Sequence, residues 1–420
     1  MPILLEKPEP GRNARRGPRR LWTVPLAPAL PTEPFDGFDL LEELGGDERP
    51  ALFQSYRDTL LWALARPDER PNLFLALPGA PTTAAGPTFL NPAIEEFRKL
   101  VRDPGRVDVA GLARACTSVS EWAALSGYAA TEYHFAVLAA RVAPADPALA
   151  FNAGRAARRH VRIEDARVWF RRSVALARRA DDEAAYASAF LGWGILEERQ
   201  GNVDRAVQLF GRAWKAAKRG KLRELAAAAR HNMIAIALAE RNLARGQGHI
   251  IGAYKLYGEG NPQLHRLAND AAGFWFVFGF YSLSLPLYEA ALPRFTRPDE
   301  RAMVLANIGR AAAALGDRDR YLEARDLALD LHRELAGSLP EIYVELAHGA
   351  FTLGYTTRAK DLAKRAIQIA RKHGDPSMVL QAESVLAAID TGAEPDRPRE
   401  PDPEMRRFAA RFLARLGELA

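Results

Sequence analysis

Apolar residues recur along most of the chain at intervals of three and four positions, which is the period of an amphipathic α-helix. The clearest example begins near residue 187, where one helix ends at Gly201 and Asn202 and a second helix follows. The apolar stripe of this second helix consists of Val203, Ala206, Val207, Phe210, Ala213, Trp214 and Ala217. We therefore predict a pair of tightly crossing helices, in which small residues such as Gly194 let the two backbones approach closely.

The same two-helix pattern returns along the chain in units that begin near residues 112, 147, 187, 227, 265, 302 and 340. In the clearest unit, Trp193 and Gly194 on the first helix are followed by Ala206 and Phe210 on the second. This arrangement resembles the tetratricopeptide repeat, which has a glycine beside a bulky residue on its first helix and A-x3-F on its second. The resemblance implies an all-α fold: a right-handed α-solenoid of about seven such helix-turn-helix units, with a helical N-terminal cap and a C-terminal helix.

Two features depart from the family pattern. Most units are longer than the usual 34 residues by about one helical turn, so we expect longer second helices or longer connections. The fourth unit has Gly246, Gly248 and Gly252 where its second helix should lie, and the fifth has Pro286 inside the first turns of its second helix. Glycine and proline both disfavour helix interiors, so we expect a kink or a different helix register in these two units.

Composition divides the chain into five segments. We expect a disordered tail rich in proline and arginine at residues 1–35, a helical cap at 36–104, the repeats at 105–390, a linker at 391–403 and an amphipathic helix at 404–420. The apolar side of that last helix is Met405, Phe408, Phe412, Leu413 and Leu416. Three roles are open for this helix: a cap folded back onto the solenoid, a surface for self-association, or a docking element for a partner or a membrane.

Charge and cysteine usage narrow the function classes. The formal net charge is +6, spread over 420 residues, so an acidic partner is permitted but not required. Cys116 is the only cysteine, which excludes an intramolecular disulfide and a cysteine-based zinc site. No run of residues reaches the ~18 apolar positions that a membrane helix needs, and no secretory signal is recognisable at the N-terminus. These features favour a cytoplasmic protein, and the frequent alanine and arginine suggest a bacterial source.

No catalytic constellation stands out. The histidines show no HExxH spacing, no GxSxG elbow occurs, and the stretch from Gly246 to Gly252 has glycines at other intervals than a phosphate-binding loop and no preceding strand. We therefore predict no catalytic residue, no metal site, no cofactor and a protein that is not an enzyme. The acidic groups at Asp181–Glu183 and at Asp317 and Asp319 fall at turns between helices, where aspartate caps helix ends.

The candidate site follows from the family resemblance. In tetratricopeptide repeats the first helix of each unit lines the inner wall, and an asparagine at its sixth position often holds the backbone of a bound peptide. Carried over to this chain, the resemblance implies a peptide groove formed by Asn152, Arg155, Arg159, Arg199, Asn232, Asp270, Asn307 and Arg310. An amide offers a donor and an acceptor that suit a peptide unit, and guanidinium groups suit carboxylates. A simpler interpretation is that these asparagines only face solvent.

The main functional hypothesis is a scaffold that binds a protein or peptide, acidic in character, in this groove. The alternative is a nucleic-acid-associated or transcriptional regulator that uses the arginine-rich arm from Arg12 to Arg20. A simpler interpretation is that this arm is a solvated tail without a binding role. The sequence predicts no membrane span, and it leaves the identity of the partner, the biological process and the oligomeric state open.

Overall fold

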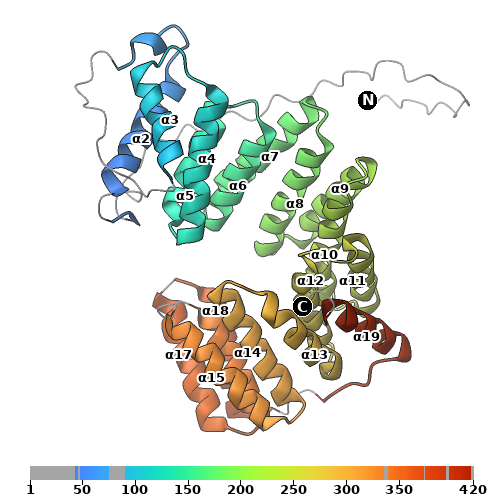
Figure 1. Ribbon diagram of the computed structural model, residues 1–420. Coiled ribbons are helices and arrows are strands. Elements are labelled where there is room, and N and C mark those ends of the chain that lie inside the picture. Colours follow the sequence, from blue (N-terminus) through green and yellow to red (C-terminus); the bar gives the residue numbers. More distant parts are fainter. Residues whose placement is uncertain are drawn as a thin grey trace, which may run out of the picture. The chain divides into compact units, whose positions relative to one another are not determined.

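The computed structural model describes residues 43–45, 48–74, 90–334, 339–372, 374–393 and 397–417, which are almost entirely helical and include no strand (Figure 1). The predicted tail at 1–35 and parts of the predicted cap lie outside the described residues. None of the helices formed by the described residues combines the length and the apolar composition that a bilayer crossing requires.

The chain divides into two compact units, and the boundary falls inside one helix, between Gly192 and Trp193. The first unit contains α2 (Glu48–Leu64), a 3₁₀ turn (Arg70–Asn72), α3 (Asn91–Arg102), α4 (Val109–Ser126), α5 (Ala129–Val142), α6 (Pro147–Arg159), α7 (Ile163–Arg179) and the first part of α8 (Glu183–Arg199). The second unit contains the rest of α8, then α9 (Val203–Arg219), α10 (Arg223–Ala239), α11 (Leu243–Tyr257), α12 (Leu264–Val277), α13 (Tyr281–Ala291), a 3₁₀ turn (Leu292–Arg294), α14 (Pro298–Ala314), α15 (Arg318–Glu334), α16 (Pro340–Thr352), α17 (Thr356–Lys372), α18 (Pro376–Thr391) and α19 (Pro403–Gly417).

Consecutive helices pack against each other as hairpins (Figure 1). The hairpins are α4 with α5, α6 with α7, α10 with α11, α12 with α13, α14 with α15, and α16 with α17. Within each unit, every hairpin also packs on the next one. These pairs begin within four residues of the unit starts expected from the sequence. The first helices of successive pairs also contact one another, as α10 does with α12 and α14 does with α16. This is the helix-turn-helix array that the tetratricopeptide resemblance implies.

The extra length of the units lies in the helices and not in the connections. From α7 to α10 every helix has 17 residues and every connection has three, so a helix pair repeats after 40 residues. The five connections between α6 and α11 each hold their middle residue in the left-handed conformation; these residues are Val161, Asp181, Gly201, Lys221 and Arg241. The amide after it donates to a carbonyl five residues back, for example Asn202 N to Glu197 O at 2.8 Å. This is the Schellman pattern, which satisfies the open carbonyls at a helix end.

Val161 is the outlier among these turn residues, because a β-branched side chain rarely adopts its φ of 58°. Its side chain is 76% exposed, so removing it sacrifices little buried area. We expect Val161→Gly to raise the free energy of unfolding by about 1 kcal/mol, the order of the left-handed penalty. Urea denaturation would measure this change. The matched variant Gly201→Val, at a φ of 74° with nothing within 4 Å of the added Cβ, should lose a similar amount. A destabilised Val161→Gly protein would contradict the strain argument.

Aromatic rings pack against glycines where two helices cross most closely. A Cβ added at Gly194 of α8 would lie 2.5 Å from the Phe210 ring of α9, and one added at Gly349 of α16 would lie 2.7 Å from Tyr321 of α15. Phe210 and Tyr321 are almost completely buried as a result. The predicted close approach at Gly194 is therefore confirmed.

The glycines of the fourth unit do not break its second helix. α11 runs from Leu243 to Tyr257 through all three of them. A Cβ at Gly246 would lie 2.0 Å from the Phe274 ring, and one at Gly252 would lie 2.5 Å from the Arg230 guanidinium. Gly248 has nothing within 4 Å. Two of the three glycines thus make room for side chains of neighbouring helices. In the fifth unit, Pro286 lies inside the second helix, α13, which has 11 residues.

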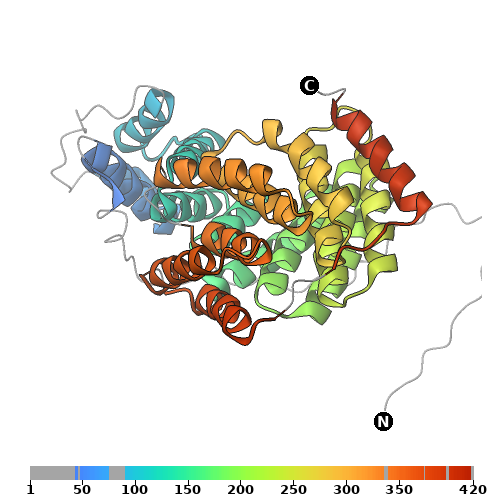
Figure 2. The same cartoon turned by 90° about the horizontal axis from the view of Figure 1, so that it is seen from below.

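The C-terminal helix packs back onto the second unit. In α19, Phe408 and Phe412 lie with ring centroids 5.3 and 4.9 Å from Tyr254 of α11, and Phe408 lies 6.3 Å from Trp275 of α12. The segment before it donates from Arg399 N to Gly279 O at 2.8 Å. Figure 2 shows α19 along the flank of this part of the array. Among the three roles left open by the sequence, the structure shows the folded-back arrangement.

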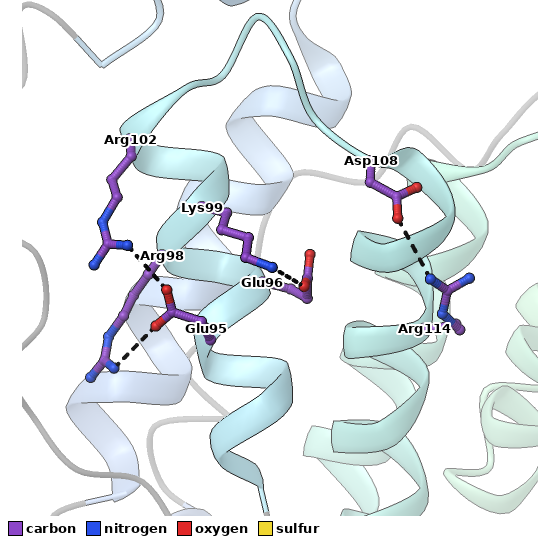
Figure 3. A network of polar contacts seen from close by, with 7 residues as sticks. All are labelled: Glu95, Glu96, Arg98, Lys99, Arg102, Asp108 and Arg114. Carbon is purple, nitrogen blue, oxygen red and sulfur yellow. Dashed lines mark hydrogen bonds and ion pairs between the residues drawn. The ribbon is translucent and has the colours of Figure 1, made fainter.

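Surface ion pairs form within α3, and a separate one joins Asp108 and Arg114 at the start of α4 in the first unit (Figure 3). Arg102 pairs with Glu95 at 3.0 Å, and Lys99 pairs with Glu96 at 2.7 Å. Such solvent-exposed pairs contribute at most ~1 kcal/mol each.

The helix-capping roles predicted for acidic turn residues are confirmed in both groups: Asp182 accepts a hydrogen bond from Ala184 N, and Asp317 accepts one from Arg320 N.

Candidate functional site

A hollow of about 490 Å³ opens on the first helices of the fourth, fifth and sixth repeats, all within the second unit. α10, α12 and α14 form its walls, α13 contributes one residue and α16 another. Four of the eight residues predicted for the peptide groove line it: Asn232, Asp270, Asn307 and Arg310. The structure thus gathers in one place residues that are up to 78 positions apart in the sequence, from Asn232 to Arg310.

The helical period explains this convergence. Counted from the unit starts expected from the sequence, Asn232, Asp270 and Asn307 share the sixth position of their units. Equivalent positions on stacked helices face the same side of the array. Glu345 holds the sixth position of the next unit and also lines the hollow, yet the sequence analysis missed it. Extending the same count by one unit would have found it.

Ion pairs join each first helix to the next along this wall. His231 Nε2 lies 2.8 Å from Asp270 Oδ2 between α10 and α12, and Arg266 lies 2.7 Å from Glu300 between α12 and α14. Arg310 lies 2.5 Å from Glu345 between α14 and α16. These contacts hold neighbouring repeats in register, and they pair the Arg310 guanidinium while the Asp270 side chain stays 53% exposed.

The amide groups present both acceptors and donors to the hollow. Asn232 Nδ2 donates one N–H to Ala228 O of its own helix at 2.8 Å, so its Oδ1 and its other N–H remain for a ligand. Asn269 Nδ2 donates to Asp270 Oδ1 at 3.0 Å, and its own Oδ1 is buried without a hydrogen-bond partner among the described residues. The carboxylates of Asp270 and Glu345 add acceptor oxygens to the lining.

Tyr288 of α13 lies at the back of the hollow and is 4% exposed. A Cβ added at Gly273 of α12 would lie 3.2 Å from its hydroxyl oxygen, so the absence of a side chain there leaves room in front of that hydroxyl. Burial raises the pKa of Tyr288, and the negative charges of Glu345 and Asp270 act in the same direction against Arg310. The hydroxyl therefore stays protonated. The sequence analysis missed this residue because it belongs to a second helix, outside the phase that marked the wall.

Aromatic and aliphatic side chains provide the apolar part of the lining. Phe276 lies beneath the Arg310 guanidinium, with the guanidinium carbon 4.7 Å from the ring centroid. Leu238 and the 39% exposed Val277 lie along the same wall. A cation above an aromatic face is held by the ring quadrupole. The hollow thus combines an apolar surface with polar groups, the usual composition of a binding site.

The other predicted site residues do not line this hollow. Asn152, Arg155 and Arg159 belong to α6 of the first unit, where Arg159 is paired with Glu132 of α5 and Arg155 is exposed. Arg199 lies exposed in the last turn of α8. Their part in a groove stays a prediction.

The described residues give little support for a metal site or a reactive cysteine. No group of three or more His, Cys, Asp and Glu side chains in the described part of the chain is placed to hold a metal ion. Cys116 is buried, and burial raises the pKa of its thiol, which disfavours the reactive thiolate.

The fold resembles solved structures at low sequence identity. A signal-transduction ATPase with a tetratricopeptide repeat sensor, from Pyrococcus horikoshii, matches with a TM-score of 0.52 and 12% identity over 92% of this chain and 59% of that one. The Cut9–Hcn1 hetero-tetramer of the APC/C matches with a TM-score of 0.50 and 16% identity over 84% of this chain and 66% of that one. This chain therefore spans less than two thirds of the length of either. No family model and no curated protein matches the sequence. The likenesses show the fold.

Proposed function

We propose that this chain, whose fold is that of a tetratricopeptide-repeat-like α-solenoid, is a non-enzymatic scaffold that binds a segment of a partner protein in the hollow of its second unit. The observation that carries the proposal is the convergence of Asn232, Asp270, Asn307 and Arg310 on one 490 Å³ hollow. Amides repeated at one helical position offer hydrogen bonds to successive peptide groups of an extended chain.

The acidic ligand expected from the arginines has less support. Arg310 is paired with Glu345, and Arg159 is paired with Glu132, so neither guanidinium is offered alone to a carboxylate. Truncating one partner of such a pair leaves the other uncompensated, so Arg310 also stabilises the wall of the hollow and Arg159 the packing of α6 on α5. The nucleic-acid alternative rests on the arm from Arg12 to Arg20, which lies outside the described residues and stays a prediction.

Binding selections would test the proposal. Random peptides of about twelve residues, displayed on phage and selected against the full chain, should yield ligands whose binding the double variant Asn232→Ala, Asn307→Ala weakens. We expect about a thirtyfold loss, since the two amides contribute ~1 kcal/mol of hydrogen bonding each. The control is Asn242→Ala at the start of α11, where the amide caps its own helix through Arg245 N at 3.0 Å. Selected peptides that bind both variants and wild type equally would place the site elsewhere.

A further inference from the structure

The charge of the hollow points away from an anionic ligand. The charged residues that line it are Asp270, Glu345, Arg310 and His231. Their sum is zero if the imidazole is protonated and −1 if it is neutral, so no protonation state of His231 gives the hollow a net positive charge. Asp270 is also the most open of the four, with 53% of its side chain exposed, whereas Arg310 is 31% and Glu345 21% exposed.

The hydrogen-bonding capacity points the same way. Asp270 accepts one hydrogen bond on each oxygen, from His231 and Asn269, and each carboxylate oxygen can accept a second. Asn232 Oδ1 and the Tyr288 hydroxyl add further acceptors. The donors in the lining are Arg310, which is paired with Glu345, and the amide N–H groups of Asn232 and Asn307. Because the charged group with open hydrogen-bonding capacity is the Asp270 carboxylate, a ligand group with several N–H donors matches this set better than one with acceptors.

Tyr288 offers a hydroxyl group to the hollow. The residue is only 4% exposed, its hydroxyl makes no hydrogen bond to a described residue, and its oxygen is not among the fully buried polar atoms. A ligand group in the hollow can therefore form a hydrogen bond with it. Gly273 stands in the interior of α12, where glycine is less favourable than alanine, and its missing side chain is what leaves the hydroxyl approachable.

We propose that the hollow takes a lysine or arginine side chain of the bound segment, with Asp270 as its charge partner and the Tyr288 hydroxyl and the asparagine oxygens as hydrogen-bond acceptors. The aliphatic stem of such a side chain would lie on Leu238, Phe276 and Val277. Long cationic side chains commonly bury their methylene groups on apolar surface in this way. This inference rests on the proposed peptide-binding function and adds the chemistry of the residue that is recognised.

The test uses the same displayed random peptides against the full chain, followed by synthetic peptides from the selected consensus. We expect lysine or arginine to be enriched at one position, and replacement of that residue by norleucine to weaken binding tenfold or more, the effect of losing a charge-assisted hydrogen bond. Asp270→Asn should remove the preference, so that the cationic and norleucine peptides bind alike. The control Asp361→Asn, at an exposed carboxylate on α17, should keep it.

A second variant changes the part of the lining beside Tyr288. Gly273→Ala places a methyl group 3.2 Å from the Tyr288 hydroxyl and favours helix, so it should leave the melting temperature unchanged or higher while weakening the cationic peptide. Peptides that compete at the hollow but carry acidic residues, or that ignore Asp270→Asn, would overturn this inference and leave the proposed function standing. Failure to select any peptide sensitive to the asparagine variants would overturn both.

Discussion

Phe210→Ala is expected to lower the free energy of unfolding of the repeats around it by about 3–5 kcal/mol, the usual cost of truncating a buried phenylalanine. Phe210 is 1% exposed, and its ring occupies the space where a side chain at Gly194 of the preceding helix would lie. Because glycine has no side chain that could move into the vacated space, the cavity should remain largely open. Hydrogen exchange should then accelerate in α8, α9 and α10.

The loss should fade with distance, because in a repeat array each unit is stabilised mainly by its immediate neighbours. Amides in α16 and α17 serve as the internal reference. Leu327→Ala on α15, where the side chain is 48% exposed, is the matched control and should change stability by less than ~0.5 kcal/mol. Unchanged protection in α8–α10 of the Phe210→Ala protein would show that this ring does not hold the two helices together.

Mild acid is expected to destabilise the second unit through two partly buried histidines. Burial lowers the pKa of His249 from its ordinary value of 6.5 to about 4, and the positive charges of Arg230 and Arg245 add to the effect. Burial likewise lowers the pKa of His348 to about 4, with Arg310 acting in the same direction. Between these values the unfolded chain binds protons that the folded chain does not, so stability falls as the pH is lowered from 6.5 towards 4.

The expected loss is at most roughly 3 kcal/mol for each histidine, because one pKa unit corresponds to about 1.4 kcal/mol and partial exposure reduces the effect. Urea denaturation of the wild type, His249→Leu and His348→Leu at a series of pH values would measure it. Each variant should flatten the pH dependence of unfolding across this window, and the double variant should flatten it most. A wild-type midpoint that does not change between pH 6.5 and 4 would contradict the partly buried, neutral state of these side chains.

The fold was open to prediction because the information is local. Helices repeat their apolar positions every three to four residues, and Gly194 followed by Phe210 marks the crossing of one helix pair. Stacking such pairs then brings equivalent positions together, which is why Asn232, Asp270 and Asn307 could be assigned to one wall from the sequence. The three glycines of α11 suggested a kink or a different helix register, yet the helix continues through all of them, and two of them make room for the Phe274 ring and the Arg230 guanidinium.

The chemistry of the site was harder to predict because it depends on contacts between repeats. Arg310 and Glu345 are 35 positions apart, and only their pairing shows that the arginine is not free to bind a carboxylate. Tyr288 reaches the hollow from a second helix, past Gly273, and neither residue carries a sequence signal of this arrangement. Residue phase identified the wall, whereas the polarity of the hollow required the side-chain contacts.

The central claim is that a partner segment binds along α10, α12 and α14, and cross-linking tests it most directly. A selected peptide carrying a photoreactive benzoylphenylalanine in place of each residue in turn can be irradiated with the full chain, and the cross-linked residues located by mass spectrometry. The account predicts cross-links concentrated on the first helices of the fourth to sixth repeats, near Asn232, Asp270 and Asn307. Cross-links gathered instead on the second helices α11 and α15 would contradict it.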